Sequence, residues 1–350
     1  MLHRLNKKRI VIIILALSLT VIIVRGIFFA FLPLPQFLEN LSGEKMKPKD
    51  ILFDEVAFIS VFDVKTNRVF EVGLEEYVFC ATAAEMPASY ELEAIKAQAL
   101  AARTYAFTHM RELYADSTPC KKGLSDVCTD SGCCQSYKSI ESLFEKWGSN
   151  ASRYAKKVYE AVKVTKGEIV SYQGEPILAL FHASSGGVTE NSENVFSSAL
   201  PYLVSVDSPN EEFHTHFADT KVLSAEYVVE AINTSFLEAN LRKAELSKQI
   251  KVLERYISGR VKTVQIGNST CTGRDLRNTL GLNSANFSIE FDSDKVIIST
   301  IGFGHGVGMS QAGANAMAQA GSNYIQILTH YYQSTEVTSI YPKYDSISPP

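Results

Sequence analysis

Residues 80–107 read CATAAEMPASYELEAIKAQALAARTYAF, and they join two helical patterns at a forced break. The first pattern has to end just before Pro87, because proline disfavours the α conformation in the residue that precedes it. We therefore expect the first helix to end at about Glu85. A carboxylate at that position meets the negative end of the helix dipole, which disfavours its ionised form. The break thus predicts a glutamic acid that can carry a proton and release it.

The second helical pattern is expected to begin after Ser89, a candidate N-cap, with acidic residues in its first turn. Its alanine-rich run carries Lys96, Gln98 and Arg103. Lys96 and Arg103 are seven residues apart and so share a helix face. From residue types alone, this face is either solvated or available to bind a ligand.

The remaining patterns predict an α+β fold, built as a single large domain or as two intertwined lobes. The chain has 350 residues of which 46% are hydrophobic, enough to bury a sizeable core. Alternating or β-branched runs favour strands, whereas apolar residues at helical spacing favour helices. Strands are expected at 56–62, 68–72, 158–165, 168–172, 177–184 and within 261–300, and helices at 221–256, after the glycines of 302–308, and at 323–332.

The N-terminus has the pattern of a membrane anchor. Four basic residues and no acid precede a long apolar run, which predicts a cytoplasmic tail at 1–9 and a transmembrane helix at 10–32. A cleaved signal peptide is the alternative, but no small-x-small cleavage site follows the run. A proline-rich and charged linker is expected at 33–50. The domain at 51–350 is then expected to lie outside the cytoplasm at the cell membrane.

The charge of this exterior part argues against nucleic acid as a partner. Without the basic residues of the tail and anchor, 29 basic residues face 38 acidic ones, a net charge of −9. Nucleic-acid binding would need a basic surface.

A cysteine-rich loop is expected at 116–136, with the spacing Cys120-x7-Cys128-x4-Cys133-Cys134. Two alternatives fit this spacing outside the cytoplasm. The four thiolates could hold a zinc ion, which would be structural because no ligand position stays open for chemistry. Alternatively, the adjacent cysteines could each form a disulfide with one of the other two.

Two further segments contain serine or glycine but lack the spacing of common catalytic or cofactor-binding motifs. HASSGG at 182–187 has no G-x-S-x-G, so a serine hydrolase is not indicated. GFGHGVGMSQ at 302–311 has alternating glycines and no G-x-G-x-x-G, so a dinucleotide site is not indicated. Alternating glycines let the backbone lie close to a ligand or another strand, with His305 and Gln311 able to point inward.

Three segments together resemble the stage II sporulation protein D family of bacterial cell-wall enzymes. They are AEMPASYELEAIKAQALAARTYA, HASSGGVTENSENVF with PYLVSV, and GFGHGVGMSQAGANAMAQAG, in this order. The resemblance covers most of the exterior part. It implies a lytic transglycosylase that cuts peptidoglycan glycan strands, with the Glu of the EMP word, here Glu85, as its catalytic residue and no catalytic cofactor.

The reaction type fits a site with a single acid. Hydrolytic glycosidases usually need two carboxylates, and the sequence offers one convincing candidate. In a lytic transglycosylase, one Glu protonates the bond between N-acetylmuramic acid and N-acetylglucosamine, and the C6 hydroxyl of the muramic acid closes a 1,6-anhydro ring. Glu85 would act as acid and then as base.

The resemblance also implies the other site residues. It assigns the HASSGG word to the substrate cleft, and it favours a cleft role for His305. In this family, Cys and His residues just before a CQxY motif can hold a structural zinc ion. The motif matches residues 134–137 of this chain. Many members have His at the position of Cys133. As a hypothesis, the second helix binds the lactyl carboxylate of muramic acid or sugar hydroxyls. The expected substrate-binding residues are Lys96, Gln98, Arg103, Ser184, Ser185, Gly186, His305 and Gln311.

The implied partners are glycan strands stripped of stem peptides, a partner amidase and a membrane scaffold protein, acting in septal wall remodelling and engulfment during sporulation. A second hypothesis comes from relatives described as amidase enhancers. In that case the domain binds glycan and stimulates an amidase without cutting.

Overall fold

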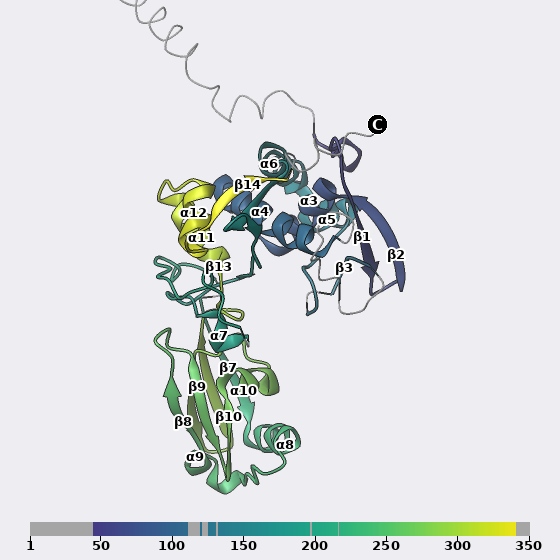
Figure 1. Ribbon diagram of the computed structural model, residues 1–350. Coiled ribbons are helices and arrows are strands. Elements are labelled where there is room, and N and C mark those ends of the chain that lie inside the picture. The colour runs from purple at the N-terminus through teal and green to yellow at the C-terminus, as the bar shows by residue number, and fades with distance from the viewer. Residues whose placement is uncertain are drawn as a thin grey trace, which may run out of the picture. The chain divides into compact units, whose positions relative to one another are not determined.

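Two separate hydrophobic cores organise the chain (Figure 1). The computed structural model describes residues 45–110, 120, 125–130, 132–196, 198–215 and 217–340. Helices and several small sheets are mixed throughout, which confirms the predicted α+β class. The predicted tail and anchor lie outside the described residues, as does most of the linker. Within the described ranges, no helix is both long enough and apolar enough to cross a bilayer.

The first core is built around helix α4, which packs against α3, α6, α11, α12 and strand β4. Sheet β2-β1-β3 borders one side of it, and sheet β14-β4-β5 another. Its elements are β1 (Phe58–Asp63), β2 (Arg68–Gly73), α3 (Leu74–Glu85), α4 (Leu92–His109), β3 (Val127–Cys128), α5 (Ile140–Trp147), α6 (Ala151–Val164), β4 (Glu168–Tyr172), β5 (Glu175–Pro176), β6 (Phe181–His182), α7 (Ser192–Val195), β13 (Met309–Ser310), α11 (Gln311–Gln319), α12 (Tyr324–Tyr331) and β14 (Glu336–Ser339).

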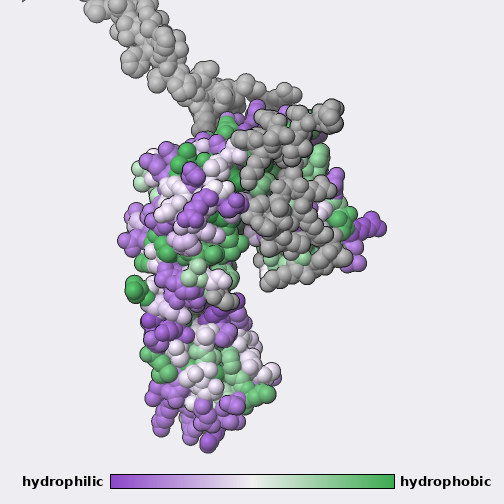
Figure 2. Space-filling model, viewed as in Figure 1, coloured by the Kyte–Doolittle hydropathy of each residue, from purple (hydrophilic) through white to green (hydrophobic). Residues whose placement is uncertain are grey.

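The second core comes from one continuous segment between α7 and β13. Sheets β10-β9-β8 and β11-β12-β7 enclose it together with α8 and α10. On the face drawn in Figure 2, hydrophilic and hydrophobic residues are interspersed over both cores. Its elements are β7 (Ala218–Ser224), α8 (Ala225–Ser235), α9 (Leu246–Gln249), β8 (Ile250–Arg255), β9 (Val261–Ile266), β10 (Ser269–Thr272), α10 (Gly273–Leu280), β11 (Phe287–Asp292) and β12 (Lys295–Ile301).

The predicted helix break is confirmed. Helix α3 ends at Glu85, and its C-cap residue Met86 is extended with φ −111° and ψ 139°, as expected before proline. The start of α4 differs from the prediction, because Ser89 lies exposed in a turn closed by the Tyr90 N–H and the Pro87 carbonyl. Glu91 is the N-cap residue instead, and its N–H donates to the side chain of Asn315.

Three secondary-structure predictions are wrong. Residues 158–165 belong to α6, whose buried residues Ala151, Ala155, Val158 and Val162 follow helical spacing despite their β-branched neighbours. Residues 177–184 contain only the two-residue strand β6, and 221–256 is a mixture of β7, α8, α9 and β8. The hairpin of β1 and β2 and the strands within 261–300 are confirmed.

A buried ion pair ties the helices of the first core together. Arg103 is fully buried on α4 and donates to both carboxylate oxygens of Glu75 on α3, from Nε at 3.0 and 3.2 Å and from Nη2 at 2.6 Å. Its Nη1 donates to the Glu168 carbonyl at 3.0 Å, and Glu75 also accepts from the Gly167 N–H at 3.1 Å. Three segments, α4, α3 and residues 167–168, therefore meet at one guanidinium–carboxylate pair.

We expect Arg103→Met to lower the free energy of unfolding by about 3–5 kcal/mol, because the change leaves the Glu75 carboxylate buried without its partner. Lys96→Met is the matched control on the same helix. Lys96 pairs with Glu93 near the surface, so its loss should cost at most about 1 kcal/mol. Urea unfolding measures both. Equal losses in the two variants would show that the buried pair does not hold the core.

Candidate active site

Glu85 lies half-buried at the C-terminal end of α3, where the chain turns away from the helix. Its Oε1 accepts a hydrogen bond from the backbone N–H of Ser136 at 2.5 Å. Among the described residues, Oε2 has no hydrogen-bond partner. The carboxyl group is thus held through one oxygen and keeps the other for a ligand.

Residues 134–137 place the Ser136 N–H against this carboxylate. Tyr137 stacks on Tyr77 of α3 with ring centroids 5.7 Å apart, and it meets Phe70 of β2 at the same distance. Gln135 is buried and donates to the Ala102 carbonyl of α4 at 3.4 Å. The segment is therefore attached to both helices that flank the break.

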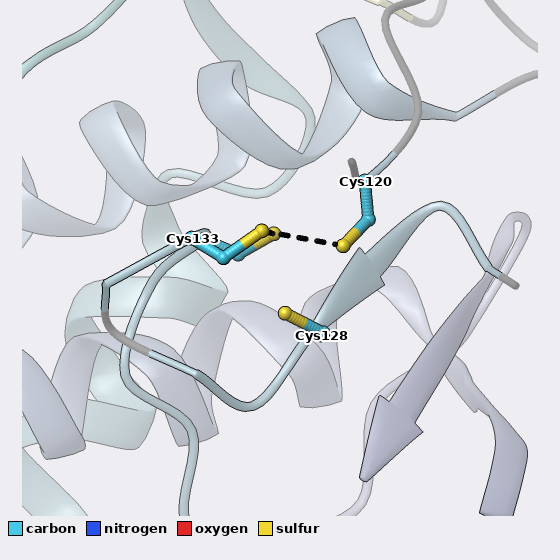
Figure 3. Close-up of side chains that lie close together, drawn as sticks. Cys120, Cys128 and Cys133 are labelled. Carbon is cyan, nitrogen blue, oxygen red and sulfur yellow. Dashed lines mark hydrogen bonds between the residues drawn. The ribbon is translucent and has the colours of Figure 1, made fainter. Parts of the chain in front are cut away.

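The same segment begins with Cys134, one of four clustered cysteines, and Cys133 directly precedes it. The sulfur atoms of Cys120, Cys128, Cys133 and Cys134 all lie within 4.8 Å of one another, and those labelled in Figure 3 point toward a common centre. Strand β3 carries Cys128 beside β1, while the N–H groups of the two adjacent cysteines donate to the Asp130 carbonyl. None of these four cysteines forms a disulfide in this structure.

The spacing of these sulfurs suits a tetrahedral metal site. Four thiolates at about 2.3 Å from a zinc ion are about 3.8 Å apart from one another. The sulfur of Cys133 lies 3.5 Å from that of Cys120 and 3.9 Å from that of Cys134. The donor set and its compactness therefore fit zinc, and all four ligand positions of such a site would be filled by protein.

The hydroxyls of the HASSGG motif, predicted to contact sugar, are buried and already hydrogen-bonded within the protein in this structure. Ser184 and Ser185 are buried, and their hydroxyls each donate to Glu211 at 2.6 Å. The N–H groups of Ser185 and Gly186 and the hydroxyl of Ser208 donate to the same carboxylate. Gly186 has φ +77°, and a Cβ there would lie 2.8 Å from the Ile301 side chain.

The glycine-rich segment is fastened through His305. Its Nε2 donates to the Phe181 carbonyl at 2.9 Å, since a carbonyl oxygen can only accept, and its Nδ1 accepts from the Val307 N–H at 3.1 Å. Both ring nitrogens are thus engaged within the protein, which gives His305 a structural role. Burial lowers the pKa of His305 to about 4, and the charges of Arg277, Arg260 and Arg274 add to this effect.

The predicted residues of α4 do not form one binding face. Arg103, predicted to bind substrate, is buried in its pair with Glu75 in this structure. Lys96 pairs with Glu93 at 2.7 Å and lies over the Tyr324 ring. Gln98 is fully buried and accepts a hydrogen bond from Gln311 at 3.2 Å, which brings two predicted residues together away from solvent.

Comparisons with known proteins agree with the sequence motifs. A family model described as Stage II sporulation protein matches residues 63–172. The stage II sporulation protein D of Bacillus subtilis (strain 168) is 39% identical over 281 residues, which cover 80% of this chain and 78% of that protein. The chain belongs to the stage II sporulation protein D family. The protein of that name from Bacillus amyloliquefaciens is 37% identical over 280 residues, with the same two coverages.

A further relative carries a different name. The amidase enhancer of Bacillus subtilis (strain 168) is 29% identical over 302 residues, which cover 73% of this chain but 39% of that protein. The matched family model spans Glu85 and the cysteine cluster, while the two stage II sporulation protein D sequences extend the similarity well beyond it.

In this member of the stage II sporulation protein D family, two site contributions could not be recognised from residue types. The Ser136 N–H is a backbone group, and only the CQSY motif that contains Ser136 marked the position. Glu211 follows Ser208-Pro-Asn in what looks like an ordinary polar turn, yet it is buried and accepts five hydrogen bonds.

The environment of His305 makes a pH-dependent contribution to stability. An unfolded histidine has a pKa of about 6.5, so between that pH and about 4 the unfolded chain takes up a proton that the folded chain refuses. Stability must therefore fall as the pH falls through this window. We expect the loss between pH 7 and pH 5 to be about 2 kcal/mol smaller in His305→Gln, which keeps one donor and one acceptor.

Urea unfolding of both proteins at the two pH values measures this difference. His182 remains in both proteins; burial lowers its pKa, and the neighbouring His305 lowers it further, so the measured difference includes this coupling between the two histidines. The same pH dependence in both proteins would exclude His305 as its source.

Proposed function

We propose that this protein is a lytic transglycosylase of peptidoglycan in which Glu85 is both the acid and the base. The proposal is carried by the half-exposed carboxyl group of Glu85 at the end of α3, held through Oε1 and open at Oε2. Membership of a family named for sporulation supports a role in the bacterial cell wall during that process, in septal remodelling and engulfment.

In the first step, protonated Glu85 gives its proton to the glycosidic oxygen between N-acetylmuramic acid and N-acetylglucosamine. The bond from the muramic acid C1 to that oxygen then breaks, and N-acetylglucosamine leaves with a new hydroxyl. In the second step, the C6 hydroxyl of the same muramic acid bonds to C1 as the Glu85 carboxylate takes its proton. The products are a 1,6-anhydro sugar and an enzyme that has regained its proton, so water is not consumed.

This reaction requires no second acid beside Glu85, because the substrate supplies the nucleophile. The positioning contact from Ser136 matters more, since small displacements of a catalytic group are costly. Tyr137 and Gln135 fix the segment that carries this donor, and both contact the flanking helices or their neighbours. In this proposal they are positioning residues.

We further propose that the four clustered cysteines hold a structural zinc ion. When bound, the ion would cross-link β3 to residues 133–134, directly before the segment that reaches Glu85. It would supply no Lewis-acid chemistry to the glycan because protein thiolates fill its coordination sphere. Its contribution to activity would be the placement of the Ser136 N–H.

The proposed location is the cell membrane, with residues 10–32 as a single-pass anchor and the domain from residue 51 on the outer side. The proposed partners are glycan strands stripped of stem peptides, an amidase and a membrane scaffold protein. The name of the amidase enhancer supports the amidase among these.

A second candidate function is supported by the same relative. The domain could bind glycan and stimulate an amidase without cutting the strand itself. The two functions differ in one product, because only the lytic reaction creates 1,6-anhydro ends when the purified protein acts alone.

We expect full-length protein purified in detergent to release 1,6-anhydro products from glycan strands that lack stem peptides, as detected by mass spectrometry. Glu85→Gln should lower the rate at least about 100-fold, because the amide cannot transfer the proton, while glycan binding persists. Glu91→Gln is the matched control, since Glu91 is exposed near the same break and its side chain makes no capping bond. It should retain full activity.

The outcomes separate the two functions. Wild-type rates from Glu85→Gln would remove Glu85 from the mechanism. If the wild-type protein binds glycan and stimulates an amidase but forms no 1,6-anhydro ends, the protein is an amidase enhancer and not a lytic transglycosylase.

The metal proposal predicts stoichiometric zinc in the purified protein by elemental analysis. Cys128→Ser should lose the metal, lower the melting temperature by about 4 °C or more, and reduce activity through the displaced Ser136 segment. Cys271→Ser, at a cysteine of the second core, should change none of these. Metal-free wild-type protein with two disulfides would decide for the alternative.

A further inference from the structure

A cavity of about 610 Å³ lies beside the glycine-rich segment and has a size typical of ligand pockets. Its walls come from α7 and the residues after it, from β9 and α10 of the second core, and from Gly132 of the cysteine loop. We call it the arginine recess, after the three arginines that line it, which are Arg260, Arg274 and Arg277.

The three guanidinium groups have no carboxylate partner in an ion pair among the described residues. Arg260 is 2% exposed and donates to the carbonyls of Val188 and Ser185 at 2.9 and 2.8 Å. Its buried Nε has no hydrogen-bond partner in the described part of the chain. The carboxylates of Glu190 and Glu211 attract this charge, but among the described residues neither accepts a hydrogen bond from it, so its burial is only partly offset.

The two neighbouring arginines are also held by neutral groups. Arg277 is half-buried and uses Nε to donate to the Leu282 carbonyl at 3.1 Å. Arg274 is exposed, donates to the Val195 carbonyl and lies over the Phe196 ring at 5.8 Å. Both keep further N–H groups for a ligand.

The acidic residues of the recess are occupied elsewhere. Glu190 is buried, and its carboxylate accepts from Asn194, Ser258 and its neighbouring backbone. Asp275 accepts from the Thr272 hydroxyl at the start of α10 at 2.7 Å. Lys262, by contrast, is paired with Glu254 at 2.9 Å. The carboxylates of Glu190 and Asp275 keep their negative charge because their partners are neutral, so they offset part of the positive charge of the recess, but the three arginines outnumber them.

The recess is linked to Glu85 through a short piece of chain. Gly132 lines it, and Ser136, four residues later, donates to Glu85. Four residues span at most about 14 Å. A group bound in the recess and a glycosidic bond at Glu85 can therefore belong to the same strand.

We propose that the arginine recess binds a carboxylate of peptidoglycan and so positions the strand for cleavage. Planar guanidinium groups bind carboxylates through paired hydrogen bonds. Peptidoglycan offers this group on the lactyl arm of muramic acid once that arm carries no peptide, or on the stem peptide itself. The assignment rests on the proposed function, and it transfers the carboxylate-binding role from Lys96 and Arg103, whose charges are already paired.

The test measures binding by isothermal titration calorimetry with full-length Glu85→Gln protein, which leaves the strands uncut. The ligands are glycan strands with free lactyl carboxylates, strands that retain stem peptides, and chito-oligosaccharide, which has no carboxylate. Arg274→Gln with Arg277→Gln should weaken binding of at least one peptidoglycan ligand about tenfold or more. Binding of chito-oligosaccharide should not change. The strand type that loses affinity identifies the source of the carboxylate.

Lys243→Gln is the charge-matched control for the single variant Arg274→Gln, because each removes one positive charge and Lys243 lies outside the recess, paired with Glu226 and Asp294. The single variant Arg274→Gln, at an exposed position, covers the case in which the double variant unfolds. Unchanged binding of both peptidoglycan ligands would overturn the proposal, and so would an equal loss for chito-oligosaccharide. Failure of the proposed function is separate, since it is read from missing 1,6-anhydro ends in the wild-type protein.

Discussion

The pair of Arg103 and Glu75 is the interaction on which the first core depends. Neither charge is accessible to water, and the cost of that burial is offset because Arg103 is bonded to both carboxylate oxygens and to the Glu168 carbonyl. The pair joins α4 to α3 and both helices to the turn before β4. Since Glu85 ends α3, its direction relative to α4 follows from this arrangement. An apolar contact at this place would hold the helices together without fixing their orientation. The planar guanidinium, with its donors in fixed directions, also sets the angle between α3 and α4.

A second buried carboxylate organises the segment that connects the two cores. Glu211 gathers the hydroxyls of Ser184 and Ser185 on the side of the first core. The Ser185 carbonyl is in turn an acceptor for Arg260 of the second core. Gly306 makes this approach possible, because a Cβ there would lie 2.3 Å from the guanidinium. Residues 184–188 thus contact one core through their hydrogen-bond donors and the other through their carbonyl groups. This explains why glycine and serine dominate the segment.

Local features could be predicted from the sequence, and contacts over long separations could not. The end of α3 follows from Pro87, one covalent constraint, and the cysteine cluster is visible as spacing. Residues 158–165 were misassigned because β-branched side chains favour strands locally, while packing against α4 decides for a helix. The role of Arg103 depends on a partner 28 residues away, and that of Ser184 on one 27 residues away. Residue type shows that these side chains are polar, but not whether their hydrogen-bond partners are water or other parts of the protein.

The arginine recess shows why net charge alone is a poor guide to what this domain binds. Residues 33–350 carry a net charge of −9, which by itself would repel an anionic polymer. At physiological ionic strength, however, exposed charges act over only about 8 Å, so a strand in the recess responds to the arginines around it more than to distant acids. Burial strengthens these local interactions further, because less water screens them. A negative surface with one positive recess therefore disfavours adhesion of anionic strands at most places and favours it beside the segment that holds Glu85.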